Sequence, residues 1–111
     1  MERRRNAVRE LKELEQVFRA LAHPSRRRIL VVLKARGGQM SAGDIANRFF
    51  CRWPTTSRHL KQLQEAGLVS VDRKGREWIY LLDRDRLQLV VGTWLHWFEE
   101  DLEEEKGTHE H

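Results

Sequence analysis

The chain has 111 residues, of which 40% are hydrophobic and 34% charged, and its formal net charge is +4. This length suits a single domain with a modest core, and the composition excludes a disordered or fibrous protein. No apolar run is long enough to span a bilayer, and a lone cysteine, Cys51, cannot build a disulfide framework. We therefore expect a cytoplasmic protein without a membrane segment.

The charges are unevenly distributed along the chain. Residues 1–98 carry 20 Lys and Arg against 10 Asp and Glu, whereas residues 99–111 carry one Lys against seven Asp and Glu. A basic body favours a polyanionic partner, and an acidic end typically stays solvated or folds over a basic surface. We predict a single domain over 1–111, which begins with a basic, frayed arm over 1–6 and ends in a disordered tail over 104–111.

Three helices are predicted in the first half of the chain. Apolar residues at three- and four-residue steps indicate an amphipathic helix over 7–22. After a helix-breaking proline, Ser25 is the expected N-cap of a second helix over 26–35. A third, short helix is predicted over 42–49, with Ser41 as its N-cap. Just before this helix, Gln39 and Met40 could form a one-bridge strand against the hairpin that is predicted further along the chain.

The stretch from Pro54 onward predicts a polar recognition helix over 54–66. Thr56, Leu60 and Leu63 fall at i, i+4 and i+7 and share one face. The other face carries only side chains that can donate hydrogen bonds. These residues are Thr55, Arg58, His59 and Gln62, with Lys61 on the flank. Gly67 stands where a left-handed C-terminal cap is expected.

A basic hairpin is predicted over 68–82. Its strands flank a glycine-containing turn over 72–76 that carries three cations, Arg73, Lys74 and Arg76. A short helix, a tight turn, a polar helix and a basic hairpin are typical of a winged helix-turn-helix. The predicted fold is therefore mainly α (α+β), with five helices and a two-stranded wing.

A fifth helix begins after Asp83, its expected N-cap, and carries a wide apolar stripe. Together with the first helix it offers more apolar surface than a chain of this size readily covers by itself. We therefore predict a homodimer formed by these two helices. The predicted interface residues are Val8, Leu11, Phe18, Val91, Trp94, Leu95 and Phe98.

The sequence resembles the ArsR/SmtB family of bacterial transcriptional repressors over roughly residues 14–99. The matching segments are FRALAHPSRRRIL in the first two helices, SAGDIANRF in the third and TTSRHLKQLQEAGLV in the recognition helix. The resemblance implies a homodimer that binds short palindromic operators and releases them on sensing a metal ion, a redox signal or another cue. No motif here identifies that inducer.

The candidate DNA contacts lie in the recognition helix and the wing. Base edges and nearby phosphates are the expected targets of the helix, and phosphates those of the wing. The candidates are Thr55, Thr56, Ser57, Arg58, His59, Lys61, Gln62, Arg73, Lys74 and Arg76. Alternatives remain for some of them: Ser57 packing between helices, His59 bonding only to phosphate, and a wing that is simply solvated.

A metal site is the alternative role of the last helix. Metal-sensing members of the family resembled carry Asp-x-His and, ten residues on, His-x-x-Glu; here the same spacing holds Asp83, Asp85, His96 and Glu99. One chain cannot bring all four together, although two antiparallel helices across a dimer could. One imidazole and three carboxylates suit zinc poorly, and helix capping and the helix dipole explain both aspartates. We therefore predict no cofactor.

Other classes of function are less well supported by the sequence. A winged helix can also serve as a protein–protein interaction module, in which the basic face meets an acidic partner. No Gly-rich phosphate loop, nucleophile motif or metal-hydrolase spacing is present, so we predict no enzymatic activity. Cys51 is either a small buried apolar residue or a redox-sensitive thiol.

Overall fold

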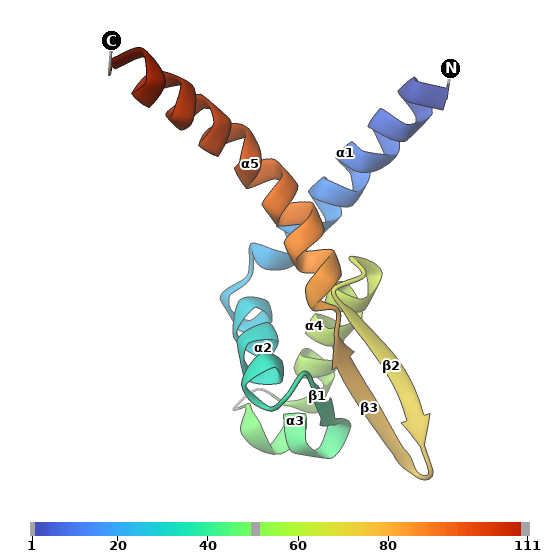
Figure 1. The fold of residues 1–111 in the computed structure, drawn as a ribbon. Helices are drawn as coiled ribbons and strands as arrows, with labels where there is room; N and C mark the ends of the chain where they lie inside the picture. Colours follow the sequence, from blue (N-terminus) through green and yellow to red (C-terminus); the bar gives the residue numbers. More distant parts are fainter. Residues whose placement is uncertain (1, 50–51, 110–111) are drawn as a thin grey trace.

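The computed structural model describes residues 2–49 and 52–109, and these form five helices and one three-stranded antiparallel sheet. In chain order the elements are α1 (Glu2–Leu21), α2 (Pro24–Ala35), β1 (Gln39–Ser41), α3 (Ala42–Arg48), α4 (Trp53–Glu65), β2 (Val69–Lys74), β3 (Glu77–Leu82) and α5 (Arg84–His109). Figure 1 shows α1 and α5 diverging in a V from a compact body that holds the other elements. The predicted winged helix-turn-helix is confirmed.

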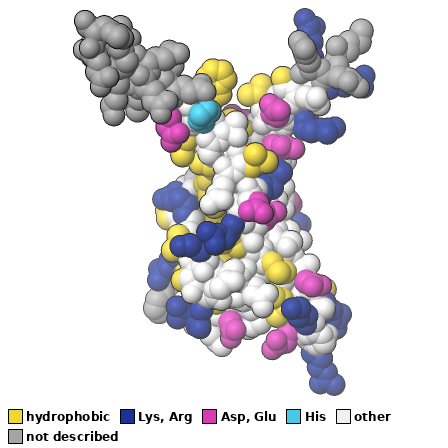
Figure 2. Space-filling view, in the orientation of Figure 1, with side chains coloured by type: hydrophobic (Ala, Val, Ile, Leu, Met, Phe, Trp, Pro, Cys, Tyr) yellow, Lys and Arg dark blue, Asp and Glu magenta, His cyan; other side chains and the backbone are white. Residues whose placement is uncertain are grey.

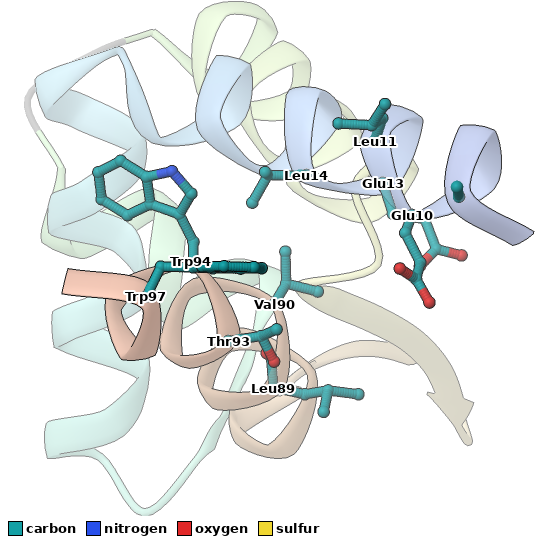
Figure 3. A pocket seen from close by; sticks show the side chains of 10 residues that line it. Glu10, Leu11, Glu13, Leu14, Leu89, Val90, Thr93, Trp94 and Trp97 are labelled. Atoms are coloured by element: carbon teal, nitrogen blue, oxygen red, sulfur yellow. The ribbon is translucent and has the colours of Figure 1, made fainter. Parts of the chain in front are cut away.

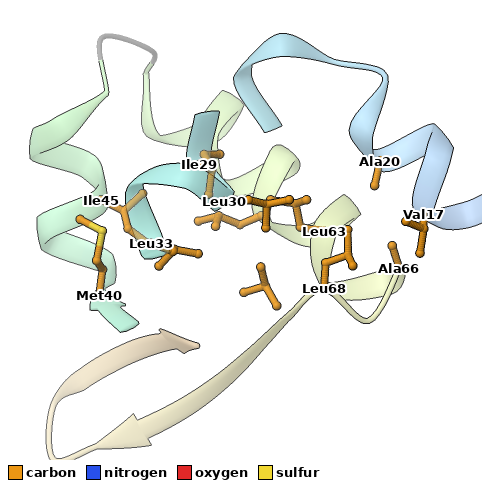
Figure 4. Close-up of a cluster of buried hydrophobic side chains, with 12 residues drawn as sticks. Val17, Ala20, Ile29, Leu30, Leu33, Met40, Ile45, Leu63, Ala66 and Leu68 are labelled. Carbon is orange, nitrogen blue, oxygen red and sulfur yellow. The ribbon is translucent and has the colours of Figure 1, made fainter. Parts of the chain in front are cut away.

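The core lies where α2, α3 and α4 meet the base of the sheet (Figure 4). The predicted apolar face of α4 is buried, because Leu60 and Leu63 pack there against Ile29 and Leu33 of α2 and Ile45 of α3. Burying one such side chain contributes about 1.5–3 kcal/mol. The core therefore fixes which face of α4 points outward.

The C-terminus of α4 is closed by a Schellman motif. Gly67 has a φ of +76°, and its N–H donates to the Gln64 carbonyl at 3.0 Å. The Leu68 N–H reaches back to the Leu63 carbonyl, also at 3.0 Å. These bonds satisfy carbonyls that the end of a helix leaves without partners. The same motif, with Gly37 at a φ of +88°, ends α2.

The sheet has the strand order β1-β3-β2, so β3 is its central strand. Lys74 pairs with Glu77 across the hairpin, which leaves Gly75 and Arg76 as a two-residue loop. The turn was predicted over 72–76, but the observed turn is shorter, because the pairing of β2 with β3 continues as far as Lys74 and Glu77. Gly75 has a φ of +64°, which the tight connection requires. β1 forms three residue pairs with β3 rather than one bridge.

Both long helices extend further than the sequence analysis predicted. The first helix, α1, begins at Glu2 rather than near residue 7, so it includes most of the stretch for which a basic arm was predicted. At the other end, α5 continues to His109, within the stretch 104–111 for which a disordered tail was predicted. Residues 2–5 are one Glu and three Arg, and residues 103–106 are three Glu and one Lys, all of which are good helix formers. Among the described helices, none is long and apolar enough to cross a membrane.

The start of α2 also differs from its prediction. The helix begins at Pro24, and its N-cap is His23 rather than Ser25. The Nδ1 atom of His23 accepts the Ser25 N–H at 3.1 Å, as a carboxylate or hydroxyl oxygen would. Proline is favoured at the first helical position, since its missing N–H would have had no partner there. The predicted N-caps Ser41 and Asp83 are confirmed.

Candidate nucleic-acid interface

The outward face of α4 carries the predicted polar side chains. It lies opposite the buried Leu60 and Leu63. Thr55, Arg58, Lys61 and Gln62 are exposed on it, and Ser57 and His59 are half-buried at its edges. An exposed row of hydrogen-bond donors on a helix that is fixed from behind is suited to the major groove.

Thr56 differs from the other predicted DNA contacts in its burial. Only 2% of its surface is exposed. The cause is its spacing, because Thr56 stands one turn before Leu60 and two before Leu63 on the buried face.

His59 occupies a different environment from its exposed neighbours. Its ring stacks on the ring of His23, with the centroids 4.4 Å apart. Nη1 of Arg26 lies 3.4 Å from its Nδ1 atom. Burial lowers the pKa of His59 below the ordinary 6.5, and the nearby charges of His23, Arg26 and Arg58 lower it further. The ring is therefore held in its neutral form at pH 7.

Arg26 and His23 are residues that the sequence reasoning missed. Besides His59, Arg26 contacts the C-terminus of α1: Nε donates to the Ala20 carbonyl at 2.7 Å, and Nη2 to the Arg19 carbonyl at 3.0 Å. A cation at the C-terminus of a helix is favoured by the helix dipole. The available signal was the cluster of arginines directly after the end of a predicted helix.

The wing places its cations along an exposed hairpin. Arg73, Lys74 and Arg76 are all exposed, and dark-blue side chains mark the tip of the hairpin in Figure 2. The guanidinium of Arg73 lies 5.3 Å from the ring centroid of Trp78, its cross-strand partner. This cation–π contact keeps Arg73 on one face of the hairpin. The hairpin extends from the body away from α1 and α5 (Figure 1).

Arg86 joins α5 to the end of α4. Its backbone N–H donates to the capping carboxylate of Asp83 at 3.0 Å. Its Nε donates to the Ala66 carbonyl at 3.1 Å, beside the Schellman glycine, Gly67. A side chain at position 67 would meet the Arg86 guanidinium. The absence of a Cβ at Gly67 therefore lets the first turn of α5 approach the C-terminus of the candidate recognition helix.

The four candidate metal ligands are not brought together within one chain. Across the described residues, no three His, Cys, Asp or Glu side chains form a group that could hold a metal ion. Asp83 caps α5, and Nδ1 of His96 lies 3.8 Å from Glu99 Oε2 one turn further along. Asp85 stands in the first turn of α5, where the helix dipole favours a carboxylate. Cys51 lies outside the described residues.

The predicted dimer residues lie along the two arms of the V. A groove of about 570 Å³ separates α1 from α5, and Figure 3 shows Leu14 facing Val90 and Trp94 across it. Phe18 packs edge-to-face on Trp94, which in turn packs on Phe98, with 5.0 Å between ring centroids in each pair. Phe98 (52%) is nevertheless exposed, and the other predicted residues are exposed or half-buried: Val8 (53%), Leu11 (61%), Leu95 (46%) and Val91.

Known proteins share both the sequence and the fold. Residues 21–72 match the model of a helix-turn-helix domain family. Over 75 residues the chain is 44% identical to the transcriptional repressor SdpR of Bacillus subtilis, covering 68% of this chain and 81% of that protein. It is 33% identical over 79 residues to the arsenical resistance operon repressor of Staphylococcus xylosus, covering 71% and 74%.

Solved structures agree with these relatives. An ArsR-like transcriptional regulator from Rhodococcus sp. RHA1 superposes with a TM-score of 0.72 at 29% identity, covering 88% of this chain and 90% of that one. A homodimeric winged helix-turn-helix DNA-binding domain from Mycobacterium bovis gives a TM-score of 0.64 at 28% identity, covering 80% and 82%. Together with the exposed polar face of α4 and the basic wing, these likenesses show that the chain belongs to the ArsR/SmtB family of winged helix-turn-helix transcriptional repressors.

Proposed function

We propose that this protein is a homodimeric repressor that reads a short palindromic DNA operator with α4 and holds the flanking backbone with its wing. The observation that supports this most is the arrangement of α4. Its apolar face is buried in the core, so its outward face is fixed, and the exposed side chains there are all hydrogen-bond donors. Membership of a repressor family supports the same reading.

Arg58 is the proposed base-reading residue of α4. It is exposed and stands in the second turn of the helix, and helix-turn-helix proteins insert the N-terminal turns of this helix into the major groove. A guanidinium can bond O6 and N7 of guanine at once, which is worth about 1–3 kcal/mol against other bases. Thr55 and Gln62 supply further donors on the same face.

The wing is proposed to bind phosphates without reading sequence. Arg73, Lys74 and Arg76 lie on a hairpin only two strands wide, with their charges exposed to solvent. Such contacts position a protein on the duplex, and each displaces counterions from it. The wing therefore contributes affinity that weakens as salt is added.

A homodimer accounts for the exposed apolar residues on α1 and α5. The Mycobacterium bovis neighbour is a homodimer, and this chain presents Leu11, Leu95 and Phe98 to solvent when alone. A two-fold axis between two copies would give two α4 helices related by the same symmetry. The preferred operator would then be palindromic, with half-sites about one helical turn apart.

The test begins with selection of a preferred duplex from a random-sequence pool by the full chain. We expect one palindromic sequence to emerge. On that duplex, Arg58→Ala should cost about 1–3 kcal/mol and should barely change binding to unrelated DNA. Lys74→Ala should weaken both alike and reduce the slope of log affinity against log salt by about 0.9. A chain that selects no duplex, and whose weak DNA binding neither variant changes, would instead be a protein–protein module.

A further inference from the structure

His59 is held from two sides by residues that precede it in the chain by more than thirty positions. Its ring stacks on that of His23, the N-cap of α2, and its Nδ1 atom lies 3.4 Å from Nη1 of Arg26. The ring is only half-buried, so part of it still faces outward from the edge of α4. The position of this side chain is therefore set before any DNA arrives.

The contact with Arg26 fixes where the imidazole carries its hydrogen. A guanidinium has only donors, so Nδ1 of His59 must accept. In a neutral imidazole, one nitrogen accepts and the other bears the hydrogen. The hydrogen is therefore on Nε2, at the opposite edge of the ring. Lowering of the pKa of His59 by burial and by the charges of His23, Arg26 and Arg58 supports the neutral form.

Arg26 is itself held in place by the end of α1. Its Nε and Nη2 atoms donate to the carbonyls of Ala20 and Arg19, at 2.7 and 3.0 Å. These two bonds orient the planar guanidinium and leave Nη1 for His59. These three contacts orient the guanidinium toward the end of α1 and toward His59, close to the recognition helix.

We propose that Arg26 is a positioning residue that holds His59 as the neutral Nε2–H tautomer, so that α4 offers one directed donor to an acceptor on a purine edge, N7 above all. This inference rests on the proposed function. It names the atom of His59 that contacts the base, Nε2, and the residue that orients His59, Arg26. A charged imidazolium would be attracted by any phosphate, whereas a neutral donor gains only where an acceptor meets it. Arg26 therefore acts on specificity through the tautomer of His59.

The first experiment needs no DNA. Long-range proton–nitrogen NMR on the full chain at pH 7.5 distinguishes the two tautomers. We expect the Nε2–H pattern for His59 in the wild type and a mixture of tautomers in Arg26→Met. Arg27→Met is the matched control, because Arg27 also donates to the end of α1, at the Leu21 carbonyl (2.7 Å). It should leave the tautomer of His59 unchanged. An Nδ1–H pattern in the wild type, or no change in Arg26→Met, overturns the proposal.

The second experiment uses the duplex that the wild type selects. Glutamine places its amide nitrogen near the position of Nε2, and asparagine near that of Nδ1. We expect His59→Gln to bind within about twofold of wild type, and His59→Asn and Arg26→Met to lose about three- to tenfold, the size of one neutral hydrogen bond. Binding to an unrelated duplex should stay the same in all three.

Replacement of single purines by their 7-deaza analogues then locates the acceptor. One such replacement should weaken the wild type and His59→Gln but leave His59→Asn unchanged. If no position shows this dependence, His59 does not read a purine N7 and the proposal fails while the repressor function stands. If no duplex is selected at all, the proposed function fails, and the role of His59 in reading DNA fails with it.

Discussion

Gly37 and Gly67 end their helices with the same motif but meet different surroundings. Both have a positive φ, of +88° and +76°, which costs a residue with a Cβ about 1 kcal/mol. A Cβ at Gly37 would meet nothing within 4 Å, whereas one at Gly67 would lie 2.8 Å from Cδ of Arg86 and closer still to its Nε. The pair therefore separates the backbone cost from the cost of displacing Arg86.

We expect Gly37→Ala to lower the free energy of unfolding by about 1 kcal/mol. Gly67→Ala should lower it by about 2–3 kcal/mol, because Arg86 must also give up its hydrogen bond to the Ala66 carbonyl. Urea denaturation of both variants measures the difference. Equal losses would mean that the bond from Arg86 to the end of α4 adds nothing to stability.

The histidine in α4 predicts how stability depends on pH. The pKa of His59 is lower in the folded chain than its ordinary 6.5, first because of burial and then because of the charges nearby. The unfolded chain therefore binds more protons below pH 6.5 than the folded chain does. Its contribution to stability is complete above pH 6.5 and decreases as the pH falls towards the lowered pKa.

We accordingly expect the urea midpoint of the wild type to fall more between pH 7.5 and 5.5 than that of His59→Gln. The comparison of slopes with pH, rather than of midpoints, cancels the effect of the substitution on packing. Parallel slopes would show that His59 does not titrate differently on folding.

Spacing along the sequence predicted the burial of single residues well where the helical period alone determines it. The period of a helix places Thr56, Leu60 and Leu63 on one face, and all three are buried. A ring nitrogen as the N-cap of α2 was missed, because His23 is not among the usual capping residues. The Arg26–His59 contact joins residues 33 positions apart, and no local pattern encodes it.

At the scale of elements, the order of helices and strands was predictable and their limits were not. Turn residues and apolar periods located all five helices and the hairpin. The start of α1 at Glu2 and the end of α5 at His109 were missed, because charged residues with high helix propensity extend a helix without any apolar signal. The third strand, β1, depends on pairing with β3, which is distant in sequence.

The candidate metal ligands of α5 and of its N-cap lead to a prediction about zinc. We expect zinc not to control DNA binding, because the four carboxylate and imidazole candidates have other roles in the chain. Asp83 is the N-cap of α5, and His96 pairs with Glu99. One imidazole with three carboxylates would bind zinc weakly, and regulation conventionally needs about 1–3 kcal/mol of coupling.

Zinc titration of the complex with the selected duplex, in wild type and His96→Ala, tests this expectation. Both should respond alike. Release of the duplex from wild type by low-micromolar zinc, with His96→Ala unaffected, would establish a metal site formed across the dimer.

At the scale of the whole molecule, the V of α1 and α5 predicts the oligomeric state. Leu11 is 61% exposed in the single chain and would be covered by a partner. We expect the wild type to sediment as a dimer at micromolar concentration and Leu11→Glu to sediment as a monomer that remains folded. Val31→Glu is the control, because Val31 is 66% exposed on α2 and does not line the groove between α1 and α5. A monomeric wild type would contradict the prediction.

Only one face of α4 is buried in the core, and this has an evolutionary consequence. Exchanges of exposed residues usually change stability by less than about 0.5 kcal/mol, so selection for folding hardly restricts Thr55, Arg58, Lys61 or Gln62. Duplicated copies of such a gene could diverge at these four positions and acquire new target sequences by single steps, each through a folded intermediate. His59 is constrained differently, since a replacement there also loses the partners His23 and Arg26. It should change later than its neighbours, and together with Arg26.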